Sequence, residues 1–503
     1  PPAPHAPTPR PGHGRGRPEA GGPLEARSAV LPYEVDAQAA FTALYQHSDP
    51  AFWLDSAHVA EGLARFSFLG DASGPLGELL EYRVGQGEVS VRPSGGAPGT
   101  EPGTVFDVLE RRLRERALRP PADLPFDFTG GYVGYFGYEL RADCGSPHTR
   151  RAPTPDAQWM FCDRFLAVDH AEGRTYAVAL CRTDQPDERQ ETDAWLAATV
   201  KALSELPRAG GGAAGTAPPP GRPDAGDTAR LAEGALRSPR STYLADIAEC
   251  RRQLRAGESY ELCLTNAATL PAPDDPLAYF LRLRALNPAP YGALLRLGPT
   301  WVLSSSPECF LRVDRRRTAE SKPIKGTAPR AADPAADAEL ARSLRTDPKT
   351  RAENLMIADL LRNDLGRVCE TGTVEVPAFL ATESYATVHQ LVSTIRGRLR
   401  PDVSAVACVR ACFPGGSMTG APKLRSLEIL DGLEQRPRGV YSGALGYLSA
   451  SGTADLSIVI RTAVVHEDTL TVGAGGAILL ASDPAAEFDE MLLKAAATLQ
   501  ALG

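Results

Sequence analysis

The stretch Gly443–Val472, GALGYLSASGTADLSIVIRTAVVHEDTLTV, decides the fold class. It predicts strands at Gly443–Ser449, Ala454–Val465 and Thr469–Val472 with no helix between them, and a helix follows only at Pro484–Ala501. Strands that come in runs, with few crossover helices, favour an α+β fold over a doubly wound parallel sheet.

The composition is that of an ordinary globular protein. Of the 503 residues, 43% are hydrophobic and 23% are charged. The net charge of −8 argues against nucleic-acid binding, which needs a basic surface. No apolar run approaches the roughly 18 residues that cross a bilayer, and no signal peptide is recognisable. Nine cysteines are too sparse for a disulfide framework, so a reduced, cytoplasmic protein is expected.

Two segments rich in Pro and Gly divide the chain. Residues 1–27 lack apolar periodicity and are predicted to be a flexible linker or remnant; residues 206–238 are predicted to be a second linker. They leave an N-terminal α+β region at 28–205, in which Gln158–Val168 is predicted to be a strand, and a catalytic region at 239–503. The first region carries no convincing catalytic group, so a structural or regulatory role is predicted for it.

Carboxylates on two predicted helices form a candidate metal site. The last helix places Glu487, Glu490 and Lys494 on one face, and Glu353 lies on or beside the apolar stripe of a helix at Lys349–Leu365. Mg²⁺ takes one or two carboxylates together with substrate oxygens. A solvated charged face and salt bridges to nearby arginines are the alternatives.

Two glycine-rich stretches favour anion binding. Gly415–Lys423 has glycines five apart, as a nucleotide-binding loop does, but Ala421-Pro422 stand where that loop needs Lys and Ser or Thr. Nucleotide binding is therefore not expected, although the helix that follows offers its N-terminal amides. Gly473–Ala477 follows a strand and lets backbone amides approach a carboxylate.

Lys325 and Glu308 are the candidate reactive groups. Lys325 stands between Ile324 and Gly326, and a lysine becomes a nucleophile only when desolvation or nearby positive charge lowers its pKa. Glu308 would be a general acid if a poorly solvated site raised its pKa. A solvated surface lysine is the commoner alternative.

An ordered set of motifs carries a family resemblance. Between about Ser241 and Gly503 the chain reads SSSPE, PIKGT, RAENLMIADLLRNDLGRV, TVHQLVS, FPGGSMTGAPK, YSGALGY, SIVIRTAVV, GAGGAI and EFDEMLLKA. In this order the motifs resemble the chorismate-utilising enzyme family. The resemblance implies an α+β fold of two large, mostly antiparallel sheets, packed as a sandwich with helices outside.

The N-terminal region is matched more loosely. The neighbourhood of Leu54-Asp55-Ser56, together with Asn287–Tyr291, resembles the tryptophan-binding pocket of some family members. The resemblance therefore implies an effector-like pocket for tryptophan that is lined by Ser56, Pro290 and Tyr291.

Within the family, Lys325 and Ser417 resemble the branch that aminates chorismate at C4. The anthranilate-forming branch has alanine and threonine at these positions, and the isochorismate- and salicylate-forming members use a lysine where Glu261 stands. The resemblance thus implies formation of 4-amino-4-deoxychorismate. An anthranilate- or isochorismate-forming enzyme, and a non-catalytic chorismate- or tryptophan-binding subunit, are the alternatives.

The resemblance also implies roles for single residues. Lys325 would attack C2 of chorismate, Glu308 would protonate the departing C4 hydroxyl, and His389 would face that hydroxyl. Glu353 and Glu490 would bind Mg²⁺, with Glu487 supporting them or binding through water. The other implied substrate-binding residues are Gly326, Thr327, Ser417, Tyr441, Arg461, Gly475, Gly476 and Lys494.

The resemblance implies a partner that supplies ammonia. No cysteine stands in the context of a glutaminase nucleophile with a following His-x-Glu. The start at Pro1, without methionine, fits the synthase half of a fused glutaminase–synthase polypeptide, and a separate glutaminase subunit is the alternative.

Overall fold

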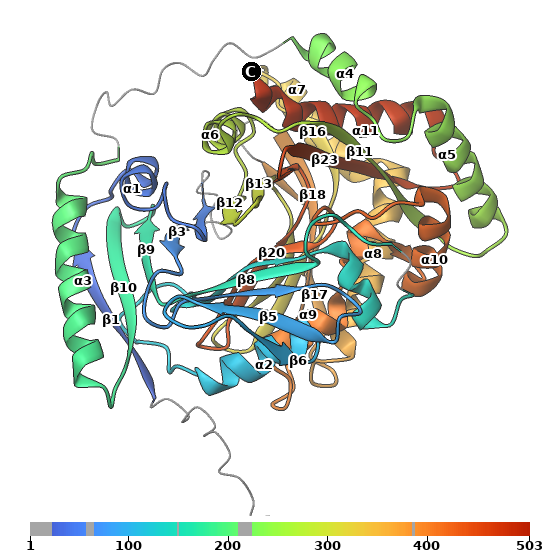
Figure 1. Ribbon diagram of the computed structural model, residues 1–503. Coiled ribbons are helices and arrows are strands. Elements are labelled where there is room, and N and C mark those ends of the chain that lie inside the picture. Colours follow the sequence, from blue (N-terminus) through green and yellow to red (C-terminus); the bar gives the residue numbers. More distant parts are fainter. Residues whose placement is uncertain (1–22, 57–64, 148–149, 210–223, 385–387) are drawn as a thin grey trace, which may run out of the picture.

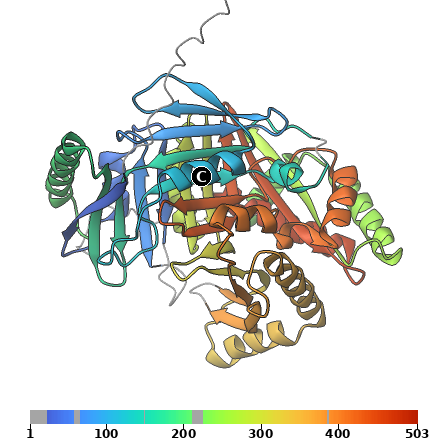
Figure 2. The ribbon, with the colours of Figure 1, turned by 90° about the horizontal axis from the view of Figure 1, so that it is seen from below.

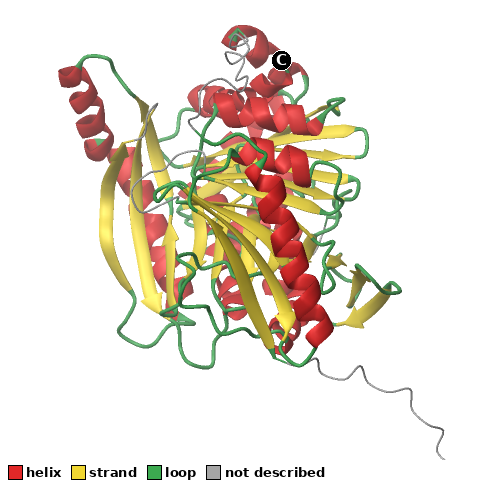
Figure 3. Ribbon diagram, turned by 90° about the vertical axis from the view of Figure 1, so that its left-hand side faces the viewer, coloured by secondary structure: helices red, strands yellow, loops and turns green. Residues whose placement is uncertain are grey.

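The computed structural model describes residues 23–56, 65–147, 150–209, 224–384 and 388–503. Its strands form two large antiparallel sheets (Figure 1), and helices lie around them (Figure 3). This confirms the predicted α+β architecture.

Both sheets combine strands from distant parts of the chain. The first sheet has the order β1 (Leu24–Leu31), β10 (Arg174–Arg182), β9 (Arg164–Asp169), β3 (Phe66–Asp71), β2 (Ala51–Asp55), β12 (Tyr291–Leu297), β13 (Thr300–Ser306), β22 (Thr462–His466), β23 (Thr469–Ile478), β11 (Glu261–Pro271) and β19 (Gly420–Ala421). The second has the order β16 (Ile324–Pro329), β18 (Val388–Arg398), β15 (Thr318–Lys322), β14 (Cys309–Val313), β21 (Ala454–Ile458), β20 (Ala444–Ser449), β7 (Gly131–Phe136), β8 (Ala157–Cys162), β4 (Glu78–Tyr82), β5 (Glu88–Pro93) and β6 (Gly99–Pro102), while β17 (Glu375–Ser384) pairs with β18. The regions 28–205 and 239–503 are therefore joined through both sheets.

Apolar side chains fill three layers. Residues of both sheets, such as Phe52, Phe165, Met160 and Tyr447, are buried together between the sheets. On the outer face of the first sheet lie α1 (Ala37–Leu44), α3 (Pro186–Ser204), α4 (Ala225–Gly234), α5 (Arg240–Arg255), α6 (Pro276–Leu286), α10 (Lys423–Glu434) and α11 (Pro484–Leu499). On the outer face of the second lie α2 (Val105–Glu115), α8 (Pro348–Gly366) and α9 (Ala405–Cys412). The layers are those of a sandwich with helices outside.

One part of the chain extends from this sandwich. The segment that includes α7 (Pro334–Thr346) and α8, yellow to orange in Figure 2, stands out on one side of the molecule. Helix α7 packs against β16, β17 and β18. The short 3₁₀ helices are η1 (Tyr138–Cys144), η2 (Gly416–Met418) and η3 (Gln500–Leu502).

Two stretches predicted as single strands are pairs of strands in different sheets. The stretch 158–168 divides at Asp163 into β8 and β9, and the stretch 454–465 divides before Arg461 into β21 and β22. These strands are buried on both faces, so their apolar pattern is continuous and does not mark the break. Arg461 marks one crossing with a left-handed backbone, at φ 51°.

Regular structure also enters the predicted linkers. Helix α4 lies within 206–238; Asp224 caps it by accepting hydrogen bonds from the amides of Gly226 and Asp227. Its Ala232 is fully buried against the first sheet's helical layer. Strand β1 begins within 1–27. Residues 1–22 and 210–223 lie outside the described residues.

Candidate active site

The side chain of Lys325, on β16, is largely buried beside an acid. Its Nζ lies 3.0 Å from Oε1 of Glu261, the first residue of β11. Burial lowers the pKa of Lys325, but the carboxylates of Glu261 and Glu353 outweigh burial and raise that pKa well above its usual value. Desolvation alone would favour the neutral amine that a nucleophile requires. The two acids reverse its effect and favour the ammonium form.

The backbone at Lys325 is fixed by its neighbours. Gly326 has φ 100°, and a Cβ atom there would lie 2.6 Å from Cγ2 of Thr350 on α8. The side-chain amide of Asn354, also on α8, donates a hydrogen bond of 2.9 Å from Nδ2 to the backbone carbonyl oxygen of Lys325. The register between β16 and β18 shifts between Ile324 and Thr327. A side chain at position 326 would therefore separate the strand from α8.

Glu308 lies close to the lysine in the connection between β13 and β14. It is 5% exposed, and burial raises its pKa to about 7, although a hydrogen bond with Ser417 and the charge of Lys325 act in the opposite direction. A carboxyl group with this pKa is partly protonated near neutral pH, which is the state that a general acid needs.

Two lysines hold the three predicted metal-binding glutamates. Nζ of Lys349 lies 2.5 Å from Glu487 on α11 and 3.8 Å from Glu353 on α8, so one cation bridges two carboxylates. Glu490 pairs with Lys494 at 2.7 Å. Among the residues that the structure describes, no group of three or more His, Cys, Asp and Glu side chains is gathered so that it could hold a metal ion.

The charges of these glutamates differ. Burial raises the pKa of Glu353 to about 7, against the charges of Lys325 and Lys349. Burial also disfavours the ionised form of Glu490, but the Lys494 ammonium outweighs it and lowers that pKa. The positive charges of Lys325 and Lys349 therefore do not fully offset the burial of the Glu353 carboxylate.

The predicted substrate-binding residues continue from this cluster. Lys494 donates a hydrogen bond of 3.0 Å to the carbonyl oxygen of Gly475 on β23, and a Cβ atom at Gly476 would meet Oε2 of Glu487 at 3.4 Å. Burial lowers the pKa of Arg461. The charges of Tyr441 and Glu490 act in the opposite direction, so these three residues are also close together.

His389 is the predicted residue whose hydrogen bonds lead elsewhere. Its Nδ1 lies 2.7 Å from Oγ of Ser384, and its Nε2 lies 3.0 Å from Oδ1 of Asp337 on α7. Neither partner belongs to the predicted set. Thr327, the remaining member, pairs with Gln390 across the β16–β18 ladder.

Two residues of the cluster were not placed there from the sequence. Lys349 stands four positions before Glu353, and this spacing on a helix is a readable signal for an ion pair. Glu261 begins a strand whose next three residues, Leu262, Cys263 and Leu264, are buried and apolar, and a buried carboxylate there requires a partner.

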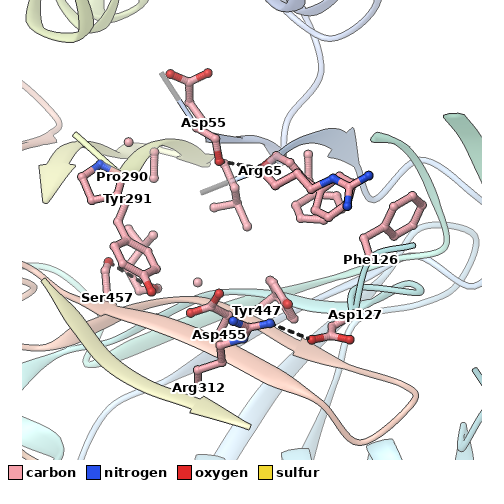
Figure 4. Close-up of a pocket in the computed structure, with 18 of the residues that line it drawn as sticks. Asp55, Arg65, Phe126, Asp127, Pro290, Tyr291, Arg312, Tyr447, Asp455 and Ser457 are labelled. Atoms are coloured by element: carbon pink, nitrogen blue, oxygen red, sulfur yellow. Dashed lines mark hydrogen bonds and ion pairs between the residues drawn. The ribbon is translucent and has the colours of Figure 1, made fainter. Parts of the chain in front are cut away.

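The residues predicted for the effector-like pocket line a separate cavity of about 510 Å³ between the sheets (Figure 4). Ser56, Pro290 and Tyr291 contribute to its wall, which also carries charged residues of both signs, among them Arg312 and Asp455. Burial raises the pKa of Asp455 to about 6. Its Oδ1 has no hydrogen-bond partner among the described residues.

Comparisons with known proteins found a matching family model and similar sequences. Residues 91–500 match the family model described as chorismate binding enzyme. The chain is 51% identical over 470 residues to an aminodeoxychorismate synthase of Streptomyces pristinaespiralis, covering 93% of this chain and 64% of that protein. It is 48% identical to an aminodeoxychorismate synthase of Streptomyces griseus, covering 94% of this chain and 63% of that protein. The chain thus spans less than two thirds of the length of these relatives.

A solved structure has the same fold. Anthranilate synthase component I from Streptococcus pneumoniae superposes with a TM-score of 0.70 at 25% identity, over 92% of this chain and 97% of that chain. Within the described part of the chain, no helix is both long enough and apolar enough to span a membrane.

Proposed function

The chain belongs to the chorismate-binding enzyme family, and from this we propose that it aminates chorismate at C4 with ammonia to form 4-amino-4-deoxychorismate. The relatives named aminodeoxychorismate synthase support this reaction. The observation that carries the proposal is the placement of an amine, Lys325, near a carboxyl group, Glu308, whose pKa is raised to about 7. The pair supplies a nucleophile and a proton donor in one buried site.

The reaction proceeds through two displacements. Nζ of Lys325, as the free amine, attacks C2 of chorismate while the ring double bonds shift and the C4 hydroxyl leaves as water with the proton of Glu308. Ammonia then attacks C4, the double bonds shift back, and the lysine amine leaves from C2. The surplus proton on the new amine returns to Glu308. A covalent intermediate of this kind divides one difficult step into two easier ones.

Mg²⁺ is the cofactor proposed for the site. Glu353 and Glu490 would hold it, supported by Glu487, and when bound it would neutralise and orient the ring carboxylate of chorismate. The fit rests on Glu353 and Glu487, because Nζ of Lys349 bridges these two buried carboxylates and a cation therefore already lies between them. Arg461, Tyr441 and the amides of Gly475 and Gly476 would bind the enolpyruvyl carboxylate. We assign His389 to the region of the C4 hydroxyl.

Two partners complete the proposal. Ammonia would come from a glutaminase, either another domain of a longer polypeptide or a separate subunit. Tryptophan would bind in the cavity of Figure 4, where its ammonium group would pair with the unpartnered Oδ1 of Asp455. Aromatic and apolar residues of the same wall, including Tyr291 and Pro290, would contact the indole ring.

The test is product identification from chorismate, Mg²⁺ and ammonium by mass spectrometry. 4-Amino-4-deoxychorismate keeps the enolpyruvyl group, whereas anthranilate has lost pyruvate and fluoresces. Lys325→Ala should abolish or sharply lower formation of the aminated product. Lys322→Ala is a matched control, since Lys322 lies on β15 and pairs with Glu320.

Other outcomes would assign other functions. Anthranilate or isochorismate as the wild-type product would replace the proposed reaction by that of another family branch. Chorismate or tryptophan binding without turnover would assign a non-catalytic subunit. Undiminished turnover by Lys325→Ala would contradict the covalent step.

A further inference from the structure

The proposed reaction leaves one proton without a destination. Lys325 attacks as a free amine, yet its surroundings hold it as an ammonium, which has no lone pair. Before it can form a bond to C2, one proton must leave Nζ and reach a nearby base. The residues around Nζ show which base is available.

Glu261 is in direct contact with the reacting nitrogen. Its Oε1 lies 3.0 Å from Nζ of Lys325, and the residue is 1% exposed. Glu261 pairs with Ala421 of β19, and its neighbour Tyr260 is 67% exposed. The ion pair shows that the side chain of Glu261 points toward the lysine, away from the surface on which Tyr260 lies.

The second oxygen of Glu261 is unusual. Oε2 is buried and has no hydrogen-bond partner among the residues described. A buried carboxylate oxygen without a donor costs free energy. Among the described residues, the Lys325 amine at Oε1 is therefore the contact through which this carboxylate would exchange a proton.

The other charged groups that face Lys325 are committed to other tasks. Glu353 on α8 is assigned to Mg²⁺, and Glu308 must keep its own proton to serve as the acid. Glu490 on α11 is paired with Lys494. Cys263, further along β11, is a fully buried thiol whose pKa burial raises, so it is not a ready base. Glu261 is left.

We propose that Glu261 is the proton acceptor that activates Lys325. As chorismate binds, Oε1 takes one proton from Nζ, which gives a neutral carboxyl and a free amine, and the amine then attacks C2. When ammonia has added at C4, the lysine leaves as the free amine and takes the proton back from Glu261. No proton is gained or lost at this pair over one turnover. The proposal rests on the proposed function, because it concerns the same lysine.

The test compares Glu261→Gln and Glu261→Asp with the wild type. For each, ammonia-dependent formation of 4-amino-4-deoxychorismate is measured from neutral to alkaline pH at constant free ammonia. Glu261→Gln keeps the shape of the side chain but cannot accept the proton. We expect its kcat at neutral pH to fall roughly 100-fold with little change in the KM for chorismate, and its deficit relative to the wild type at the same pH to narrow as the pH rises. Glu261→Asp should keep a substantial fraction of the activity.

The alternative, a purely electrostatic role, predicts the opposite. Removing the Glu261 anion removes a charge that raises the pKa of Lys325, so more lysine would be uncharged at a given pH. If Glu261 only stabilises the Lys325 ammonium, Glu261→Gln should keep or increase its kcat, and the pH dependence of kcat should shift to lower pH. That result overturns the proposal.

Two controls separate the possible failures. Glu320→Gln, which alters an acid–lysine pair on β15, should leave kcat unchanged, and thermal unfolding should show that all variants are folded. A wild type that forms no aminated product overturns the proposed function itself. If the wild type forms the aminated product and the kcat of Glu261→Gln is undiminished, only the proposed role of Glu261 is overturned.

Discussion

At the scale of single residues, the site contains two acids, Glu308 and Glu261, in different surroundings. Burial raises the pKa of Glu308 to about 7, whereas Glu261 lies 3.0 Å from Nζ of Lys325. The raised pKa of Glu308 supports its proposed role as the proton donor.

The first prediction concerns Glu308. Its acid form is present below its pKa, so wild-type kcat should fall as pH rises through about 7 when free ammonia is held constant. Glu308→Gln has no acidic proton to donate, so kcat should fall roughly 100-fold or more and this alkaline decrease should disappear. The measurement is the pH dependence of kcat for product formation.

Ser417→Ala is the matched control for Glu308. The hydrogen bond from Ser417 lowers the pKa of Glu308, so its loss should move the alkaline decrease to higher pH without removing it. An unchanged alkaline decrease in Glu308→Gln would assign the titration to a different group.

At the scale of elements, α11 contributes most to the site. Its start was predictable, because Asp483 caps it by accepting a hydrogen bond from Ala486 and a proline follows at the first helical position. The shared face of Glu487, Glu490 and Lys494 follows from helical spacing. Contacts between elements, such as that of Lys349 with Glu487, have no local signal because the partners are 138 residues apart.

Some strands were predictable, such as those at 443–449 and 469–472, but their pairing was not. The division of 158–168 and of 454–465 between two sheets depends on which surface each half covers, and both halves are apolar. For the same reason the sequence did not indicate that Glu261 and Lys325, on strands of different sheets, would meet. The motifs supplied the candidate site residues, and the three-dimensional arrangement supplied their contacts.

The second prediction concerns metal binding by α11. Glu490→Gln should raise the Mg²⁺ concentration for half-maximal velocity by roughly tenfold or more, because a charged oxygen donor is replaced by an amide. Asp489→Asn is the control on the same helix; this acid is 64% exposed and pairs with Arg240, so its Mg²⁺ requirement should match the wild type. Removal of Mg²⁺ by a chelator should abolish wild-type turnover, and re-addition should restore it. If the velocity of both variants depended on Mg²⁺ concentration in the same way, Glu490 would be excluded as a ligand.

At the scale of the whole molecule, the two sheets enclose the cavity of Figure 4. Its wall takes residues from β2, β12, β14, β20 and β21, that is, from both sheets and from both sequence regions. A ligand there would contact both layers of the sandwich at once.

The third prediction concerns tryptophan in this cavity. Isothermal titration should detect binding, and affinity should weaken as pH falls below about 6, because protonation of Asp455 removes the charge that faces the ligand ammonium. Asp455→Asn should weaken tryptophan binding by roughly tenfold or more, as expected for loss of a buried ionic hydrogen bond. Indole-3-propionate, which lacks the ammonium, should be insensitive to this change. Equal tryptophan affinity in both proteins would contradict the assignment.

The interleaved strands have a consequence for how the molecule is made. Strand β2 pairs with β12, which follows about 240 residues later in the chain, and β7 pairs with β20, which follows more than 300 residues later. Contacts across such distances close slowly. During translation the early strands emerge from the ribosome with open edges, which invite wrong pairing. We expect the nascent chain to need a chaperone until the strands before α11 have been synthesised.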